Sequence, residues 1–288
     1  MLDEASARPR DHCAARTSAG VAAGPGGGSA GVAARSAGWA ALRAAVIAQQ
    51  PELSAPHPGA PGLCVVCRGP VGRRSPRCFQ CDLHRECGDG LLADVVVPVA
   101  FAVKGGSHAL QLWQYKSARA APEAAERAVF QLRALLLVFL REHGGCVWVG
   151  GGVPPPTHLA VVPTARGRPG EHPLRAMLAP YLGSPWAQLR AQAGGQGSRD
   201  LDPDRFAAAP VPGAAVLLID DTWTTGASVQ SAAMALRRAG ARSVAAVVLG
   251  RHVAPEAAAT VDLGPAASPF LPDACAVHGA HPGSDVAR

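Results

Sequence analysis

Two carboxylates stand next to a hydroxyl-rich loop in residues 216–228, which have the sequence VLLIDDTWTTGAS. The four apolar residues predict a buried strand, and Asp220 and Asp221 follow it directly. The carboxyl end of a strand is where open parallel sheets bind their ligands. The loop carries threonines and one glycine and leads into a predicted helix, whose first backbone N–H groups favour an anion. This segment therefore predicts a phosphate cradle beside two carboxylates.

The two parts of this segment suit different groups of one ligand. Carboxylates cannot hold a phosphate directly, but they accept hydrogen bonds from vicinal hydroxyls or anchor Mg²⁺ through water. Gly226 lets the backbone approach the phosphate closely. A diol clamp beside a phosphate cradle indicates a ribose 5-phosphate. An ordinary turn with a capping Asp is the alternative, and Trp223 either covers the phosphate or packs on the surface.

A second kind of chemistry lies upstream, where four cysteines form two Cys-x₂-Cys pairs. Each pair puts two thiolates on one turn, so that two pairs supply a tetrahedral Zn²⁺ site. A four-sulfur site leaves no open coordination position, which favours a structural zinc; redox-active or free thiols are the alternative. The ligands predicted are Cys64, Cys67, Cys78 and Cys81. His84 and Cys87 are spare donors nearby, and the roles of Cys87, Cys146 and Cys275 stay open.

Alternating strands and helices must position these groups. Apolar strands without polar alternation, separated by helices, imply a parallel sheet covered on both faces, and hence the α/β class. The expected strands are residues 94–104, 158–162, 215–219 and 244–249, and the expected helices are residues 122–143, 172–182 and 227–239. Gly144 and Gly145 are expected to end the long helix. Residues 190–213 are expected to form a loop.

Composition divides the 288 residues into four parts. Residues 1–60, rich in Ala, Gly, Ser and Pro, predict a disordered low-complexity tail with one short helix at residues 33–48, or an artefact of the assigned translation start. Residues 61–93 form the predicted zinc knuckle, and residues 94–255 the α/β domain. Residues 256–288 form a Pro- and Ala-rich C-terminal tail.

Several classes of protein are excluded by the same composition. No apolar run approaches the roughly 20 residues that span a bilayer, and Asp3 and Glu4 are unlike a secretory signal. The net charge of +6 comes from dispersed basic residues, which favours solvated surface over a dense polyanion-binding patch. Clustered cysteines without a signal indicate a reducing compartment. We therefore expect a cytoplasmic protein without membrane insertion, and a homodimer is left open.

Residues 216–228 closely resemble the phosphoribosyl-pyrophosphate (PRPP) binding motif of type I phosphoribosyltransferases, in which an apolar run precedes two acidic residues and a Thr/Gly loop. The resemblance implies that fold, with PRPP bound together with Mg²⁺. It implies transfer of the phosphoribosyl group to an unknown nitrogenous acceptor, a nucleobase or an amine, with release of pyrophosphate. Asp220 and Asp221 would be the catalytic carboxylates and bind the ribose hydroxyls. The 5-phosphate would be held by Thr222, Thr224, Thr225, Gly226, Ala227 and Ser228.

The family also binds pyrophosphate on an upstream loop that follows a strand, and residues 159–170 fit this position. Thr164, Arg166 and Arg168 would hold the pyrophosphate, since guanidinium groups suit a leaving group with several negative charges. Residues 192–205 would form the loop that closes over the substrate, with Arg199 and Arg205 as phosphate contacts.

A zinc knuckle followed by a transferase segment is similar to the ComF-like branch of these enzymes, over residues 61–252. The match includes Tyr115 and Lys116, which that branch places near a helix start. The branch's Arg-Gly-Phe-Asn-Gln-like run is replaced here by residues 169–174 with Glu171, so the acceptor side is not predicted.

The alternative function is a non-catalytic competence-type protein that binds nucleotides or single-stranded DNA on the same fold, with the DNA-uptake machinery as partner. Net positive charge and a zinc ribbon are compatible with it, but aromatic residues are only 5% of the chain and offer few stacking platforms. A purely structural zinc protein would leave residues 216–228 unexplained.

Overall fold

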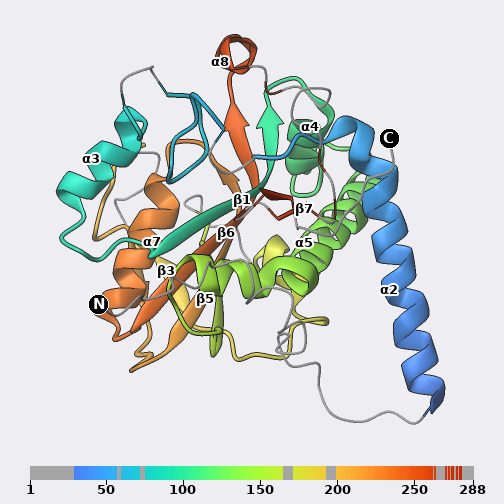
Figure 1. Cartoon of the computed structure of the whole chain (residues 1–288). Helices are drawn as coiled ribbons and strands as arrows, with labels where there is room; N and C mark the ends of the chain where they lie inside the picture. The colour runs from blue at the N-terminus through green and yellow to red at the C-terminus, as the bar shows by residue number, and fades with distance from the viewer. Residues whose placement is uncertain are drawn as a thin grey trace, which may run out of the picture.

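A four-stranded parallel sheet forms the centre of the computed structural model (Figure 1). The structure describes residues 29–56, 60–71, 75–164, 171–192 and 199–261, together with residues 263, 270, 272, 274, 275, 277, 279 and 280. The strand order is β1–β6–β5–β2. The strands are β1 (Val95–Val103), β2 (His158–Val161), β5 (Ala215–Trp223) and β6 (Ser243–Val253). All neighbouring pairs run parallel, which confirms the predicted α/β architecture.

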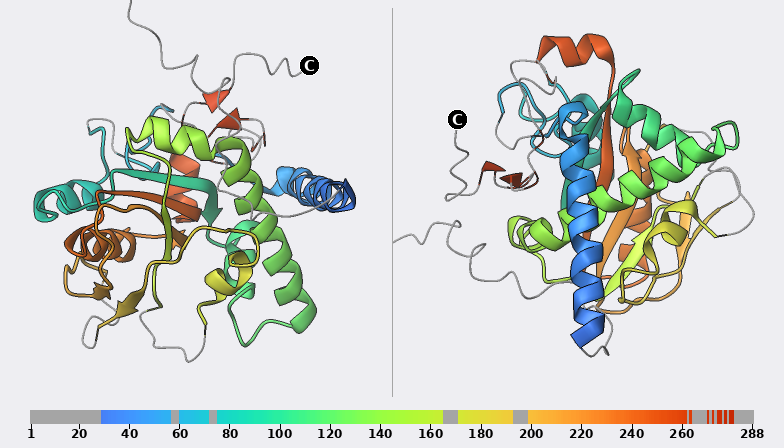
Figure 2. Two further views of the ribbon diagram at one scale, coloured as in Figure 1. Left: turned by 90° about the horizontal axis from the view of Figure 1, so that it is seen from below. Right: turned by 90° about the vertical axis from the view of Figure 1, so that its right-hand side faces the viewer.

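Both faces of the sheet are covered, which explains the unbroken apolar runs at residues 215–219 of β5 and residues 244–249 of β6. In β5, Leu217 and Ile219 pack into the core on the side of α5 (Pro122–Gly150), whereas Val216 and Leu218 pack on the side of α7 (Ala227–Arg238). Successive residues of a strand point to opposite faces, so a sheet between two helical layers needs an unbroken apolar run. Figure 2 shows the two layers.

Helix α5 is longer than the sequence predicts, because it continues through Gly144 and Gly145 to Gly150. Val147 and Trp148 in the added turns are buried in the same core as the sheet. Burial of each such side chain contributes about 1.5–3 kcal/mol, more than the roughly 1 kcal/mol that a glycine costs in a helix interior. The predicted stop at the glycine pair is therefore wrong.

Helix α2 (Ser29–Gln49) belongs to the folded domain, followed by the short 3-10 helix η1 (Gln50–Glu52). It packs against α5, where Arg43 pairs with Glu142 at 3.2 Å and Val46 is fully buried. Further on, Ser54 accepts a hydrogen bond from the backbone N–H of Phe101 in β1. The helix expected at residues 33–48 is thus confirmed and longer. Treating residues 38–56 as part of a tail is wrong; residues 1–28 lie outside the described residues.

The remaining elements are short. The region expected to be a loop at residues 190–213 contains an antiparallel pair, because Phe206 is buried against α7 and the adjoining backbone pairs. The helix predicted at residues 172–182 is present but covers only residues 173–178. These elements are α3 (Phe79–Cys87), α4 (Ser107–Gln114), α6 (Pro173–Leu178), α8 (Pro255–Thr260), β3 (Leu189–Ala191), β4 (Phe206–Ala208), β7 (Ala274–Cys275) and β8 (Gly279–Ala280). In the part of the chain that the structure describes, no helix is both long and apolar enough to cross a bilayer.

Candidate functional site

The two adjacent carboxylates lie within the last four residues of β5, because this strand extends four residues past the predicted end at Ile219. The extension pairs with β6, with Asp220 opposite Val248 and Thr222 opposite Gly250. Asp221 is buried and Asp220 is half-buried. Both carboxylates are therefore held by the sheet itself at its carboxyl edge.

A cavity of about 470 Å³ opens at this edge. It joins the carboxyl end of β5 to the start of α7 and to the segment that follows β2. Of the residues predicted to bind PRPP and pyrophosphate, its walls include Thr164, Asp220, Asp221, Thr222, Thr224, Thr225, Gly226, Ala227 and Ser228. Lys116, His172 and Arg199 also line it. Arg166 and Arg168 lie outside the described residues.

Asp221 is an acceptor for two side chains from α4's end. The Tyr115 hydroxyl and the Lys116 ammonium both donate a hydrogen bond to its Oδ2 atom. Tyr115 follows the last residue of α4, so the Tyr-Lys pair lies at a helix end and not near a helix start. A buried carboxylate is stable when it is paired and hydrogen-bonded, and these two donors supply both conditions. Asp221 is therefore fixed in orientation beside the cavity.

Asp220 has a different environment. Its Oδ1 atom accepts a hydrogen bond of 2.8 Å from the backbone N–H of Asp221. Burial and then the neighbouring Asp221 charge raise the pKa of Asp220 well above its usual value, and Lys116 only partly opposes them. The charge of Asp221 is thus balanced by Lys116, whereas Asp220 favours a proton, a cation or a hydroxyl group as partner.

The pKa of Asp220 predicts a pH-dependent effect of Asp220→Asn on stability. A raised folded-state pKa means that stability is lost as the pH rises from the unfolded-state value of about 4 through the folded-state value. The amide removes that charge and still accepts the Asp221 hydrogen bond. In Mg²⁺-free buffer we expect the variant to melt at a higher temperature than wild type at pH 8 and at the same temperature near pH 3. A lower melting temperature at pH 8 would contradict the assigned environment.

The loop between β5 and α7 depends on Gly226. This residue has φ of +87° at the start of α7, a conformation that side chains rarely adopt. The ring of Trp223 lies directly beneath it, since a Cβ on Gly226 would stand 2.0 Å from the ring. Trp223 is 1% exposed, so it neither covers the phosphate position nor packs on the surface, and both expectations were wrong. It is a core residue that supports the loop.

Replacing Gly226 with alanine should therefore destabilise the protein by about 3 kcal/mol, from left-handed backbone strain and overpacking together. Urea unfolding measures this change. Gly213→Ala is the matched control, because Gly213 has φ of +68° but open space around its Cβ position. That variant should lose about 1–2 kcal/mol. Equal losses in both variants would show that the Trp223 ring does not restrict the loop.

Two arginines predicted to contact phosphate have different positions. Arg199 lines the cavity, and its backbone carbonyl accepts a hydrogen bond of 3.1 Å from the Thr225 hydroxyl. Arg205 is buried and donates to the Ser228 hydroxyl at 3.3 Å and to the Asp200 carbonyl at 2.7 Å. The structure therefore brings Arg199 to the cavity, whereas Arg205 supports the loop through Ser228.

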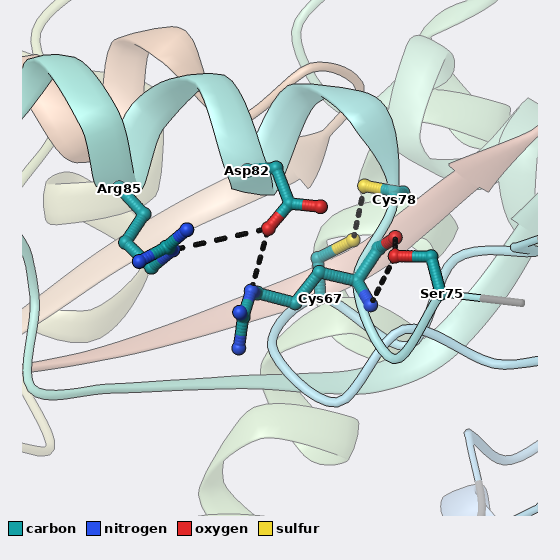
Figure 3. A network of polar contacts seen from close by, with 6 residues as sticks. Cys67, Ser75, Cys78, Asp82 and Arg85 are labelled. Atoms are coloured by element: carbon teal, nitrogen blue, oxygen red, sulfur yellow. Dashed lines mark hydrogen bonds and ion pairs between the residues drawn. The ribbon is translucent and has the colours of Figure 1, made fainter.

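The four predicted cysteine ligands converge at the start of α3. Their sulfur atoms all lie within 4.8 Å of one another. Figure 3 shows two of the four ligands, Cys67 and Cys78, whose sulfur atoms are 3.7 Å apart. Thiolates about 2.3 Å from a tetrahedral Zn²⁺ stand about 3.8 Å from each other, so the spacing fits that ion. Cys78 is the N-cap of α3 and Cys81 lies in its first turn. The cluster can hold a metal ion.

Backbone hydrogen bonds form the first knuckle. The Cys64 N–H donates to the Gly69 carbonyl at 2.7 Å, and the Arg68 N–H donates to the Cys64 carbonyl at 2.9 Å. Hydrogen bonds from the other three thiols hold the pKa of Cys64 well below its usual value, against the effect of burial. The same hydrogen bonds raise the pKa of Cys78 and Cys81, so the four thiols interact as one group.

The spare donors stay outside the cluster. His84 is buried, and burial lowers its pKa; in the described part of the chain neither of its ring nitrogens has a hydrogen-bond partner. Cys87 is exposed, and Cys146 is buried within α5. The side chain of Cys275 lies outside the described residues.

Sequence reasoning missed Arg251, which is buried at the end of β6 and donates hydrogen bonds to backbone carbonyls of the β5–α7 loop. An arginine two residues after the apolar run 244–249 was the available sign. It also missed a hollow of about 440 Å³ that shares Lys116 and Thr222 with the first cavity. The half-exposed Trp113 and the basic residues Lys104 and His252 line this hollow.

Comparison with known proteins returns no match: none among protein-family models, none among curated proteins and none among solved structures.

Proposed function

We propose that this chain is a phosphoribosyltransferase-like protein of the ComF-like type, which binds PRPP with Mg²⁺ and transfers its phosphoribosyl group to a nitrogenous acceptor. The observation that carries the proposal is the cavity at the carboxyl end of β5. Two adjacent carboxylates and a hydroxyl-rich helix start line it together. This combination suits a ligand that has both a diol and a phosphate.

In this proposal each part of the cavity binds one part of PRPP. The 5-phosphate lies on residues 224–228, where N–H groups at the start of α7 and the hydroxyls of Thr224 and Ser228 donate to it. The ribose hydroxyls donate to Asp220 and Asp221, and Tyr115 and Lys116 keep Asp221 in place. The pyrophosphate extends toward Thr164, which lines the cavity. Mg²⁺, when bound with PRPP, neutralises charge on the departing pyrophosphate.

The reaction is a displacement at C1 of the ribose. The bond from C1 to the pyrophosphate oxygen breaks, a bond from C1 to the acceptor nitrogen forms, and the nitrogen loses a proton. The carboxylates stabilise positive charge that develops on the ribose. Asp220 is suited to accept the proton, because its environment raises its pKa.

The cysteine cluster has a structural role in this proposal. Four thiolates leave no open position on a tetrahedral Zn²⁺, so the metal would hold the knuckle together and take no part in the transfer. Its thiols would stay reduced in the cytoplasm.

A second candidate function is single-stranded DNA binding. The half-exposed Trp113, beside Lys104 and Lys116 in the neighbouring hollow, favours it, since an aromatic platform and cations suit an unpaired base and its phosphate. The same features also suit a nucleobase acceptor.

Pyrophosphate release separates the two candidates. The protein is incubated with Mg²⁺-PRPP and a panel of nucleobases and amines, and pyrophosphate is measured. Release that needs one acceptor class and is lost in Asp221→Asn supports the transferase. Absence of release and of PRPP binding, with salt-dependent binding of an oligonucleotide that Asp221→Asn leaves unchanged, supports the DNA-binding protein.

A further inference from the structure

Arg251 lies between the cysteine knuckle and the segment from Trp223 to Ser228, here named the phosphate loop because the proposed function places the 5-phosphate on it. Its side chain is buried at the end of β6, and its Nη1 atom donates to the carbonyl oxygens of Trp223 and Thr224 at 3.2 Å each. It also donates to the His252 carbonyl. One guanidinium group therefore holds two consecutive carbonyls of the loop that begins at Trp223.

The backbone of the knuckle packs against the same guanidinium group at Gly69. A Cβ added to Gly69 would stand 2.1 Å from Nη2, 2.7 Å from Cζ and 2.9 Å from Nε of Arg251. Gly69 is fixed by the first knuckle, because its carbonyl accepts the hydrogen bond from the Cys64 N–H. The cysteine ligands therefore determine where the backbone that contacts Arg251 lies.

The hydrogen bond from Arg251 to the Thr224 carbonyl also affects a backbone N–H group in the wall of the cavity. In a planar trans peptide the carbonyl and the following N–H point in opposite directions. Arg251 holds the Thr224 carbonyl, and it thereby fixes the direction of the Thr225 N–H in the wall of the cavity. Donors that are oriented before an anion arrives cost little reorganisation when it binds.

We infer that Arg251 is a positioning residue through which the metal-binding knuckle holds the phosphate loop in its binding conformation. The inference rests on the proposed function, because it takes this loop as the site of the 5-phosphate. The inference couples the two sites. A metal ion in the knuckle raises the affinity of the loop for phosphate, and bound phosphate raises the affinity of the knuckle for the metal by the same factor. The probe for the loop is ribose 5-phosphate, and the probe for the knuckle is its metal content.

Gly69→Ala tests the contact without removing a ligand. Gly69 has no positive φ, so alanine fits its backbone, and only the flexible end of Arg251 must move. We expect one metal ion per chain, as in wild type, and roughly tenfold weaker binding of ribose 5-phosphate in calorimetry, from the loss of charged hydrogen bonds. Gly145→Ala is the control, since a Cβ there meets open space within α5; its affinity should equal that of wild type.

Arg251→Lys keeps the positive charge near the thiolates but loses the planar fork that spans two carbonyls. We expect the same weakening, with metal content unchanged. If Arg251 only balanced the charge of the thiolates, this variant would bind ribose 5-phosphate like wild type, and the inference would be wrong. The variant also decides the matter if Gly69→Ala fails to fold.

The reciprocal effect has a readout independent of catalysis. Saturating ribose 5-phosphate should slow metal transfer from wild type to a colorimetric chelator several-fold, and should not slow it in Arg251→Lys. If wild type binds ribose 5-phosphate and both Gly69→Ala and Arg251→Lys bind it with the same affinity as wild type, the inference is wrong and the proposed function is unaffected. Wild type that binds neither ribose 5-phosphate nor PRPP overturns the proposed function, and the inference with it.

Discussion

Replacing Cys64 with serine is expected to remove the metal and to destabilise the protein by about 3 kcal/mol or more. Cys64 is fully buried, and its thiol contacts the other three cysteines of the cluster. A serine hydroxyl is a poor ligand for Zn²⁺, and the free energy of metal binding in such knuckles is also free energy of folding. Metal content and urea unfolding measure the two effects.

Cys87→Ser is the matched control, because Cys87 is exposed at the end of α3 and belongs to the same short segment. It should retain one metal ion per chain and the stability of wild type. Cys64→Ser with full metal content, or with wild-type stability after the metal is lost, would show that the cluster does not hold the knuckle together.

Asp221→Asn is expected to lower the affinity for Mg²⁺-PRPP at least about 100-fold. The amide removes a charged acceptor of ribose hydroxyls, and it removes the ion pair between Asp221 and the Lys116 ammonium. Two charge-assisted hydrogen bonds of about 1.5–3 kcal/mol each account for this factor. At a PRPP concentration near the wild-type Kd, PRPP should raise the melting temperature of wild type and have almost no effect on that of the variant.

Asp204→Asn is the control for this variant, since Asp204 makes an exposed ion pair with Arg238 away from the cavity. Exposed pairs contribute little, and PRPP should stabilise this variant as it does wild type. Equal stabilisation of Asp221→Asn and wild type by PRPP would remove Asp221 from the binding site.

The features that the sequence predicts correctly depend on neighbours along the chain. Apolar runs define the strands of the sheet, and the spacing within each Cys-x₂-Cys pair places two sulfurs on one turn. The two carboxylates and the hydroxyl-rich residues 222–228 are one continuous segment, so their proximity needs no tertiary information. The eight predicted binding residues of this segment accordingly line a single cavity, and Thr164 joins them from the segment that follows β2.

The features that sequence reasoning misses depend on contacts between distant segments. Helix α5 passes Gly144 because Trp148 is buried beyond it, and helix α2 is ordered against α5 through Val46. Tyr115 contacts Asp221 across 106 residues, and Arg251 contacts the Trp223 carbonyl across 28. No local pattern specifies which strand end meets which loop, so these partners follow only from the fold.

Calorimetric titration of Mg²⁺-PRPP into wild type and into the double variant Asp220→Asn/Asp221→Asn tests the central claim most directly. We predict saturable binding at one site per chain in wild type and no binding in the double variant, with both proteins folded by circular dichroism. No binding heat in wild type, or equal binding in both proteins, would contradict the assignment of this cavity to PRPP.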